Sequence, residues 1–200
     1  MSKIRAATAQ ETSRDAGAWA FVDIGFSKSA KSCGLLCDDG EPSVMTYANL
    51  VARLTSMTSE SGRALHLVIE APLSAAFNVA GNPTGRSIEK RDGKARNWYV
   101  GPGAAVLLAA TYLLRDLECS SPVREIRLLE GFVSFKPKGS KSSHSTDVIA
   151  LREVIWNPSA KRGRIFHKEQ LASSPSDIVR SSFAVAGMDF GVPPVVLVEG

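Results

Sequence analysis

Short apolar segments of strand length alternate with segments of helical periodicity along most of this chain. Compact apolar runs rich in β-branched and aromatic residues favour buried strands, while apolar residues spaced three and four apart favour helices packed on one side. The expected strands cover residues 19–26, 32–37, 41–46, 64–69, 124–129 and 195–198. The expected helices cover residues 47–57, 103–117, 146–155 and 176–185.

This order predicts an α/β fold with one mixed β-sheet. The first strands follow each other closely and would form antiparallel hairpins, whereas the later strands alternate with helices and would be parallel, with helices on both faces of the sheet. The length of 200 residues fits a single domain, which we expect over residues 18–200. Residues 1–17 are polar and are predicted to form a flexible N-terminal arm. Residues 73–99 form a long basic insertion, and residues 160–166 are basic and irregular.

Composition excludes several classes of protein. The longest apolar run, residues 104–114, is well short of the roughly 20 residues that a membrane span needs, so we expect a buried helix there and no membrane association. Residues 1–17 contain no apolar core of a secretory signal. The chain has three cysteines and no CxxC pair, which argues against a disulfide framework and favours a reducing, cytoplasmic location.

Four acidic residues occupy positions that an apolar core does not favour. Asp23 lies inside the first apolar strand, while Glu70 and Glu130 end the runs 65–69 and 126–129. A carboxylate in or beside a buried strand is costly unless a cation or a hydrogen-bond donor compensates it. Glu70 and Glu130 could instead mark the exit of the chain to solvent, and Asp147, in the first turn of a helix, could simply interact with the helix dipole.

Taken together, these four acids predict one metal site. Oxygen ligands from several elements suit Mg²⁺ or Mn²⁺. Two such ions about 3.5–4 Å apart can activate a water and stabilise the leaving oxygen during attack on a phosphodiester. His144 stands three residues before Asp147 and would face the same way on a helix, although a histidine in a Ser/Lys-rich loop can also be merely solvated.

Basic residues are concentrated near these acids. The formal net charge is +4 and the sequence pI about 9.1, and the Lys/Arg excess gathers in the insertion and in residues 131–170. Such clusters suit the phosphate backbone of a nucleic acid, although solvated loops explain them equally well. The expected nucleic-acid contacts are Arg86, Arg91, Arg96, Lys136, Lys138 and Lys141.

These motifs, in this order, resemble the ribonuclease H-like superfamily and, within it, the RuvC-type Holliday-junction resolvases. The segments that carry the resemblance are VDIGFSKSAKSCGLL with Asp23, LHLVIEAP with Glu70, and HSTDVIALREV with His144 and Asp147, and the match spans residues 18–155. The resemblance implies that Asp23, Glu70 and Asp147 bind metal and that His144 binds metal or assists the attacking water. The IEAPLS turn is similar to a poorly described branch of ribonuclease H-like proteins in which an acid recurs at the place of Glu130.

We therefore expect a Mg²⁺- or Mn²⁺-dependent nuclease that acts on DNA or RNA, and the resemblance makes a homodimer plausible. Phe26, at the fourth position of the Asp-x-Gly turn, departs from the resolvase pattern and puts junction specificity in doubt. An alternative keeps the fold without the chemistry, as a catalytically inactive module that binds nucleic acid or protein. An actin-like phosphotransferase is disfavoured, because it needs two such halves, and the chain also has no P-loop.

Overall fold

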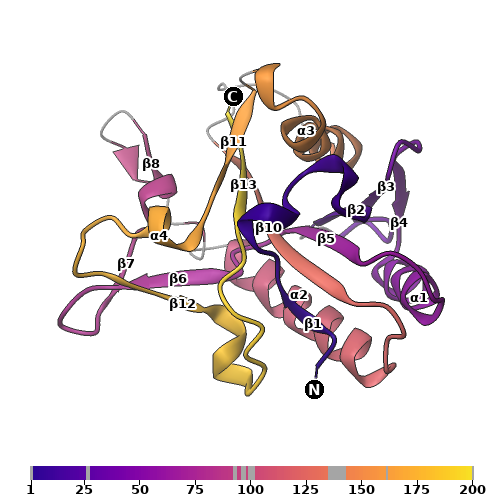
Figure 1. Ribbon diagram of the computed structural model, residues 1–200, viewed down its shortest axis with the longest axis horizontal. Helices are drawn as coiled ribbons and strands as arrows, with labels where there is room; N and C mark the ends of the chain where they lie inside the picture. Colours follow the sequence, from indigo (N-terminus) through magenta and orange to yellow (C-terminus); the bar gives the residue numbers. More distant parts are fainter. Residues whose placement is uncertain are drawn as a thin grey trace.

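The computed structural model describes residues 2–25, 28–91, 94–95, 98, 102–134, 143–160 and 162–199. These residues form a mixed α/β structure around a central sheet that contains both parallel and antiparallel strands (Figure 1). The α/β class and the mixed sheet predicted from the sequence are confirmed.

Within the described residues, eight strands form the main sheet in the order β11-β13-β10-β5-β2-β3-β4, with β1 also paired to β10. β2, β5, β10, β13 and β1 are mutually parallel where they pair, while β3, β4 and β11 run antiparallel to their neighbours. The strands are β1 (Ile4–Ala6), β2 (Ala18–Ile24), β3 (Cys33–Cys37), β4 (Ser43–Met45), β5 (Leu65–Glu70), β10 (Ile126–Ser134), β11 (Gly163–Phe166) and β13 (Val195–Glu199).

Helices cover both faces of this sheet (Figure 1). Helices α1 (Tyr47–Ser59) and α2 (Pro102–Cys119) pack on one face, where alternate residues of β2 such as Ala20 and Val22 join the core. Helix α3 (His144–Trp156) packs on the other face, against the intervening residues Trp19 and Phe21. Because strand side chains alternate between faces, the unbroken apolar sequence of β2 supplies two cores at once.

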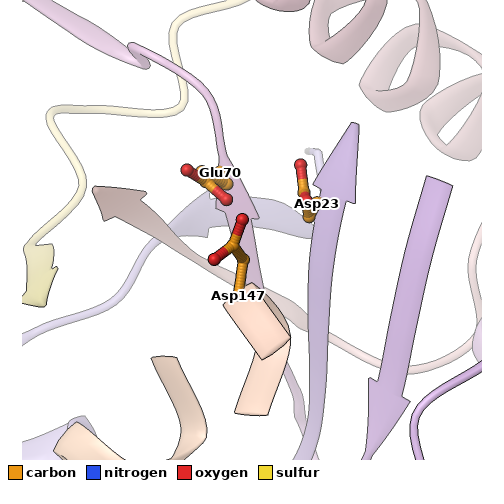
Figure 2. Close-up of side chains that lie close together, drawn as sticks. All are labelled: Asp23, Glu70 and Asp147. Carbon is orange, nitrogen blue, oxygen red and sulfur yellow. The ribbon is translucent and has the colours of Figure 1, made fainter. Parts of the chain in front are cut away.

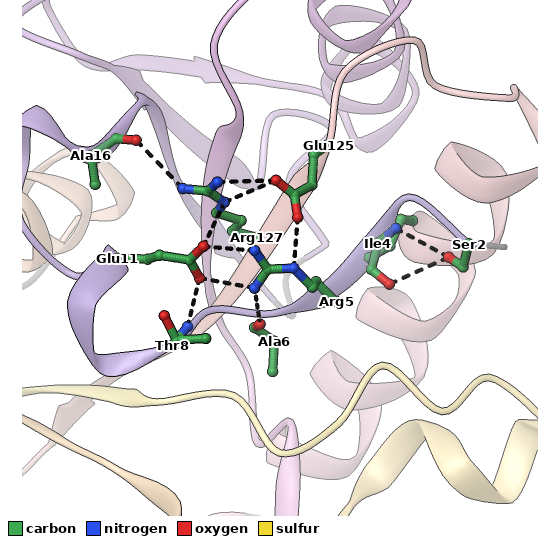
Figure 3. Close-up of polar contacts among 9 residues, drawn as sticks. All are labelled: Ser2, Ile4, Arg5, Ala6, Thr8, Glu11, Ala16, Glu125 and Arg127. Carbon is green, nitrogen blue, oxygen red and sulfur yellow. Dashed lines mark hydrogen bonds and ion pairs between the residues drawn. The ribbon is translucent and has the colours of Figure 1, made fainter.

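The N-terminal segment belongs to the sheet, so the prediction of a flexible arm over residues 1–17 is wrong for its described part. β1 adds to β10 in parallel register, with Ile4 opposite Ile126, and the short helices η1 (Ala9–Glu11) and η2 (Arg14–Ala16) follow it. A closed ring of four alternating charges holds it there (Figure 3). Arg5 and Arg127 each pair with both Glu11 and Glu125 at N–O distances of 2.6–3.2 Å.

The insertion folds into structure of its own. β6 (Ser74–Phe77) and β7 (Pro83–Thr84) pair with each other, and β12 (Ile178–Ser181) joins β6 to complete a small separate sheet. The turn η3 (Ser87–Glu89) follows, and β8 (Lys90–Arg91) pairs with β9 (Lys94–Ala95). The small sheet extends to one side of the main sheet (Figure 1).

Two late segments differ from their predictions. Residues 176–185, expected as a helix, form β12 and then the short helix η5 (Ser182–Ala186). In β12 exposed and buried residues alternate, which is the pattern of a strand with one buried face. Residues 160–166, expected to be irregular, contribute β11 to the main sheet. The short helices η4 (Pro158–Ala160) and α4 (Lys168–Leu171) flank it.

His66 provides a test of the core beneath α3. It is fully buried on β5 and stacks on Trp19 with ring centroids 4.3 Å apart, and neither ring nitrogen has a hydrogen-bond partner among the described residues. Burial lowers the pKa of His66 to about 4, below the ordinary value of 6.5. The unfolded chain therefore binds a proton that the folded chain resists, and stability falls as the pH drops through this window.

We expect the free energy of unfolding to be about 2–3 kcal/mol lower near the bottom of this window than at neutral pH, through His66 alone. Urea unfolding followed by tryptophan fluorescence measures it. A His66→Phe protein, which keeps a ring on Trp19, should lose that part of the pH dependence. Identical pH slopes for the two proteins would contradict the assignment.

Candidate metal centre

Asp23 and Glu70 lie side by side at the ends of two neighbouring strands. β2 and β5 are parallel, and their register places Asp23 opposite Glu70. Paired residues of parallel strands project to the same face of a sheet. Asp23 shares its face with Trp19 and Phe21, so both acids lie on the face that α3 covers.

Helix α3 brings the third acid. Its first turn contains Asp147, and the hydroxyl of Ser143 caps the helix by accepting a hydrogen bond from the Thr146 amide at 3.2 Å. The start of the helix rests on the β2–β3 hairpin at two glycines. A Cβ atom at Gly25 would lie 2.2 Å from Cε1 of His144, and one at Gly34 would lie 2.7 Å from its carbonyl oxygen. A side chain at Gly34 would push the helix away from the strands, because it meets the helix backbone, whereas one at Gly25 would displace the His144 ring and the carbonyl of Ser32.

The three carboxylates meet at this point. Asp23, Glu70 and Asp147 each offer an oxygen, and these oxygens lie within 4.8 Å of one another (Figure 2). Asp23 is 7% exposed and Asp147 is 8% exposed, while Glu70 is partly exposed, so the cluster lies at the border between the core and solvent. Gathered carboxylates repel one another, and a divalent cation bound by their oxygens would compensate that repulsion. The residues that the sequence singled out for a metal site are thus brought together in three of the four cases.

His144 contacts the cluster through Asp23. Its Nδ1 lies 2.6 Å from Oδ2 of Asp23, and its side chain remains partly exposed. The predicted neighbourhood of His144 and Asp147 at the start of one helix is observed. The contact is with an acid of the cluster, so the ring is placed to orient that carboxylate.

Glu130 does not belong to the cluster, and its prediction as a metal ligand is wrong. β10 continues past Glu130 to Ser134, and Gly131, not Glu130, stands opposite Glu70. Glu130 therefore projects to the opposite face of the sheet, the face of Ile126 and Leu128. There it is fully buried, and burial raises its pKa above the usual range although Arg86 opposes the shift.

Arg86 is the partner of Glu130, so its prediction as a nucleic-acid contact is also wrong. Its side chain is fully buried and its guanidinium lies 2.8 Å from Glu130 and 2.9 Å from Glu89. A group without solvent exposure cannot meet a phosphate. The backbone of Arg91 lies in β8, and its side chain is outside the described residues, as are Arg96, Lys136, Lys138 and Lys141 altogether.

Two features were not predicted from the sequence: the close packing of the start of α3 on Gly25 and Gly34, and the ion pair between Glu130 and Arg86. The signal for the first was the glycine two residues after Asp23 together with Gly34 in the following strand. The signal for the second was strand alternation: Ile126, Leu128 and Glu130 share one parity. Which face of the sheet these three residues occupy relative to Glu70 is set by the register between β10 and β5.

The sequence matches no protein family, no curated protein and no solved structure. Among the described residues, no helix has the length and apolar character needed to cross a membrane.

The close packing of α3 on the hairpin can be tested at Gly34. A Gly34→Ala substitution should lower the free energy of unfolding by about 1–3 kcal/mol, because the new methyl group meets the backbone of His144 at the start of the helix. Gly62→Ala is the matched control, since its Cβ would meet only the flexible end of Arg124, and its effect should stay within about 0.5 kcal/mol. Urea unfolding measures both, and equal stability of the two variants would contradict this packing.

Proposed function

We propose that this chain is a divalent-metal-dependent nuclease of the ribonuclease H-like type, which hydrolyses phosphodiester bonds in DNA or RNA. The observation that carries the proposal is the convergence of Asp23, Glu70 and Asp147, from two strands and a helix, within 4.8 Å. Carboxylates from separate elements are the usual ligands of Mg²⁺ and Mn²⁺ in phosphoryl-transfer sites.

The topology supports the same proposal. A hairpin of β2 and β3 carries the first acid, the adjacent parallel strand β5 carries the second, and α3 carries the third. This is the order expected from the resemblance to RuvC-type resolvases. The acids lie at the carboxyl ends of parallel strands, where α/β folds commonly place their ligands.

The donor set fits Mg²⁺ or Mn²⁺, because it consists of hard oxygen atoms from three acids. Ions bound there would supply positive charge that lowers the pKa of a water and neutralises the developing charge on the leaving oxygen. Asp23, Glu70 and Asp147 would hold the ions, and His144, 2.6 Å from Asp23, would keep that carboxylate turned toward them.

Nucleic acid as the partner remains part of the proposal. The segment that precedes α3 in the sequence contains Lys136, Lys138 and Lys141, and α3 begins at the metal centre. Positive charge close to the acids would hold the phosphate backbone beside them. A homodimer stays an expectation from the resemblance.

Titration calorimetry with Mn²⁺ tests the metal centre. The wild type should bind Mn²⁺, and Asp23→Asn should weaken binding by about tenfold or more, because it removes a charged ligand. Glu60→Gln, an exposed acid after α1, should bind like the wild type. A wild type that takes up no Mn²⁺ at millimolar concentration would rule out the proposed chemistry.

The same variants extend the test to activity. Asp23→Asn and Glu70→Gln should lower cleavage of single- and double-stranded DNA and RNA by orders of magnitude while nucleic-acid affinity changes little. Metal binding and nucleic-acid binding without any cleavage would instead favour the inactive binding module.

The contribution of the lysines that precede α3 in the sequence can be tested through salt dependence. Neutralising Lys138 and Lys141 to glutamine should weaken nucleic-acid binding most at low salt and reduce the log–log salt slope by about 1 per lysine. Arg53→Gln combined with Arg115→Gln removes equal charge from exposed sites on α1 and α2, on the far face of the sheet, and should change the slope little. Equal slopes for both double variants would contradict a specific role of Lys138 and Lys141.

A further inference from the structure

A cluster of three charged side chains lies entirely within the protein on the face of the sheet opposite the metal centre. Arg86, Glu89 and Glu130 are all fully buried. The guanidinium of Arg86 lies between the two acids: Nη2 is 2.9 Å from Oε1 of Glu89 and 2.8 Å from Oε1 of Glu130. We call these three residues the buried charge cluster.

The buried charge cluster binds the turn that follows Glu70. Oε2 of Glu130 accepts a hydrogen bond from the backbone amide of Leu73 at 2.9 Å. Nη1 of Arg86 donates to the hydroxyl of Ser74 at 2.8 Å and to Oε2 of Glu130 at 2.9 Å. The turn is therefore held at two successive residues by the two members that face it.

Glu89 contacts the cluster differently. Its carboxylate accepts bonds from the side chain of Arg86 and from the Arg86 backbone amide at 3.1 Å, all within the turn η3. Among the described residues, Glu89 makes its hydrogen bonds and its ion pair with Arg86, and none of these contacts reaches Leu73 or Ser74. Glu89 thus shares the burial and the partner of Glu130 without sharing its contact with the turn.

Little chain separates this anchor from the metal centre. Leu73 is the third residue after Glu70, the amide of Ala71 donates back to the carbonyl of Ile69 at 2.8 Å, and Pro72 fixes one backbone torsion. Ser182 binds the other side of the turn, with its amide on the carbonyl of Leu73 and its hydroxyl on that of Pro72. The direction in which the chain leaves Glu70 is therefore set at Leu73.

Stability alone gives a poor account of such a cluster. A buried ion pair recovers little more than the cost of removing its charges from water, and well-packed apolar residues commonly stabilise a fold as much or more. Charged hydrogen bonds do, however, impose direction and distance that apolar contacts do not. The cluster offers geometric control of one turn.

We propose that Glu130, supported by Arg86, is a positioning residue for the metal centre: by holding the Leu73 amide from the opposite face of the sheet, it fixes the carboxylate of Glu70 relative to Asp23 and Asp147. This inference rests on the proposed function for its metal, but the hydrogen bonds to the Leu73 amide and the Ser74 hydroxyl, which we call the clamp, exist without it. Glu130 is also connected to Glu70 through the backbone, because the next residue, Gly131, pairs with Glu70 in the sheet.

The test compares Glu130→Gln with Glu89→Gln. Both remove one charge from a fully buried acid that pairs with Arg86. Calorimetry should show Mn²⁺ affinity reduced about tenfold in Glu130→Gln, the lower end of the range for altered outer partners of metal ligands. In Glu89→Gln the affinity should stay the same as in the wild type, because Glu89 has no contact with the turn. Thermal unfolding, recorded for both, separates this loss from general destabilisation. Ser74→Ala, a milder change that removes only one hydroxyl from the clamp, should reduce affinity in the same direction and replaces Glu130→Gln if that protein does not fold.

A second measurement needs no metal. Hydrogen exchange of the metal-free proteins should be faster at the amides of Ala71 and Leu73 in Glu130→Gln and unchanged there in Glu89→Gln. Equal Mn²⁺ affinity in the wild type and Glu130→Gln, or equal losses in both variants, would overturn the positioning role. If the wild type itself binds no Mn²⁺, the proposed function fails, and the exchange rates then decide the clamp: unchanged rates in Glu130→Gln overturn it, and faster rates confined to that variant support it.

Discussion

The start of helix α3 can reach the ends of β2 and β5 because two glycines of the β2–β3 hairpin lie beneath it. Gly25 and Gly34 leave no room for a Cβ against His144, so the helix starts almost on the strands themselves. That approach is what places Asp147 beside two acids from the sheet and His144 against Asp23. The remaining features of the site follow from strand pairing, which sets Asp23 and Glu70 opposite one another.

Much of this arrangement could be predicted from local pattern. The strands around Asp23 and Glu70, helix α1 and helix α3 are all visible as apolar runs or periodic segments. Asp23 and Glu70 stand out as charges in or beside buried strands, and Asp147 stands out in the first turn of a helix. The error at Glu130 has a different origin. Every residue from Ile126 to Phe132 other than Glu130 and Arg127 is apolar or glycine, so the pattern does not reveal which face each residue takes. One residue of register separates a position beside Glu70 from one on the far side of the sheet.

Non-local pairing limited the other predictions. The polar residues near the N-terminus looked like a mobile arm because their partners, Glu125 and Arg127, lie far away in the sequence. β12 looked helical because its partner strand β6 is in the insertion, which itself lacked a strand pattern. Buried Arg86 looked like a surface cation for the same reason: its counter-charge Glu130 was assigned to another role. The positions of these charged residues depend on partners that are distant in the sequence, and composition alone does not identify those partners.

Strand β10 has a consequence for how the protein is made. On one side it pairs with β5, and on its other side β1 occupies its first residues and β13 its last ones. The two strands that share this side come from opposite ends of the described sequence, Ile4–Ala6 and Val195–Glu199. During translation, β1 is therefore already available to pair with the first residues of β10. The last residues of β10 have no partner strand on that side until β13 has been synthesised. The backbone N–H and C=O groups of Glu130–Ser134 that face β13 can pair with other chains during that interval. This part of the sheet can be completed only after residue 199 has been synthesised.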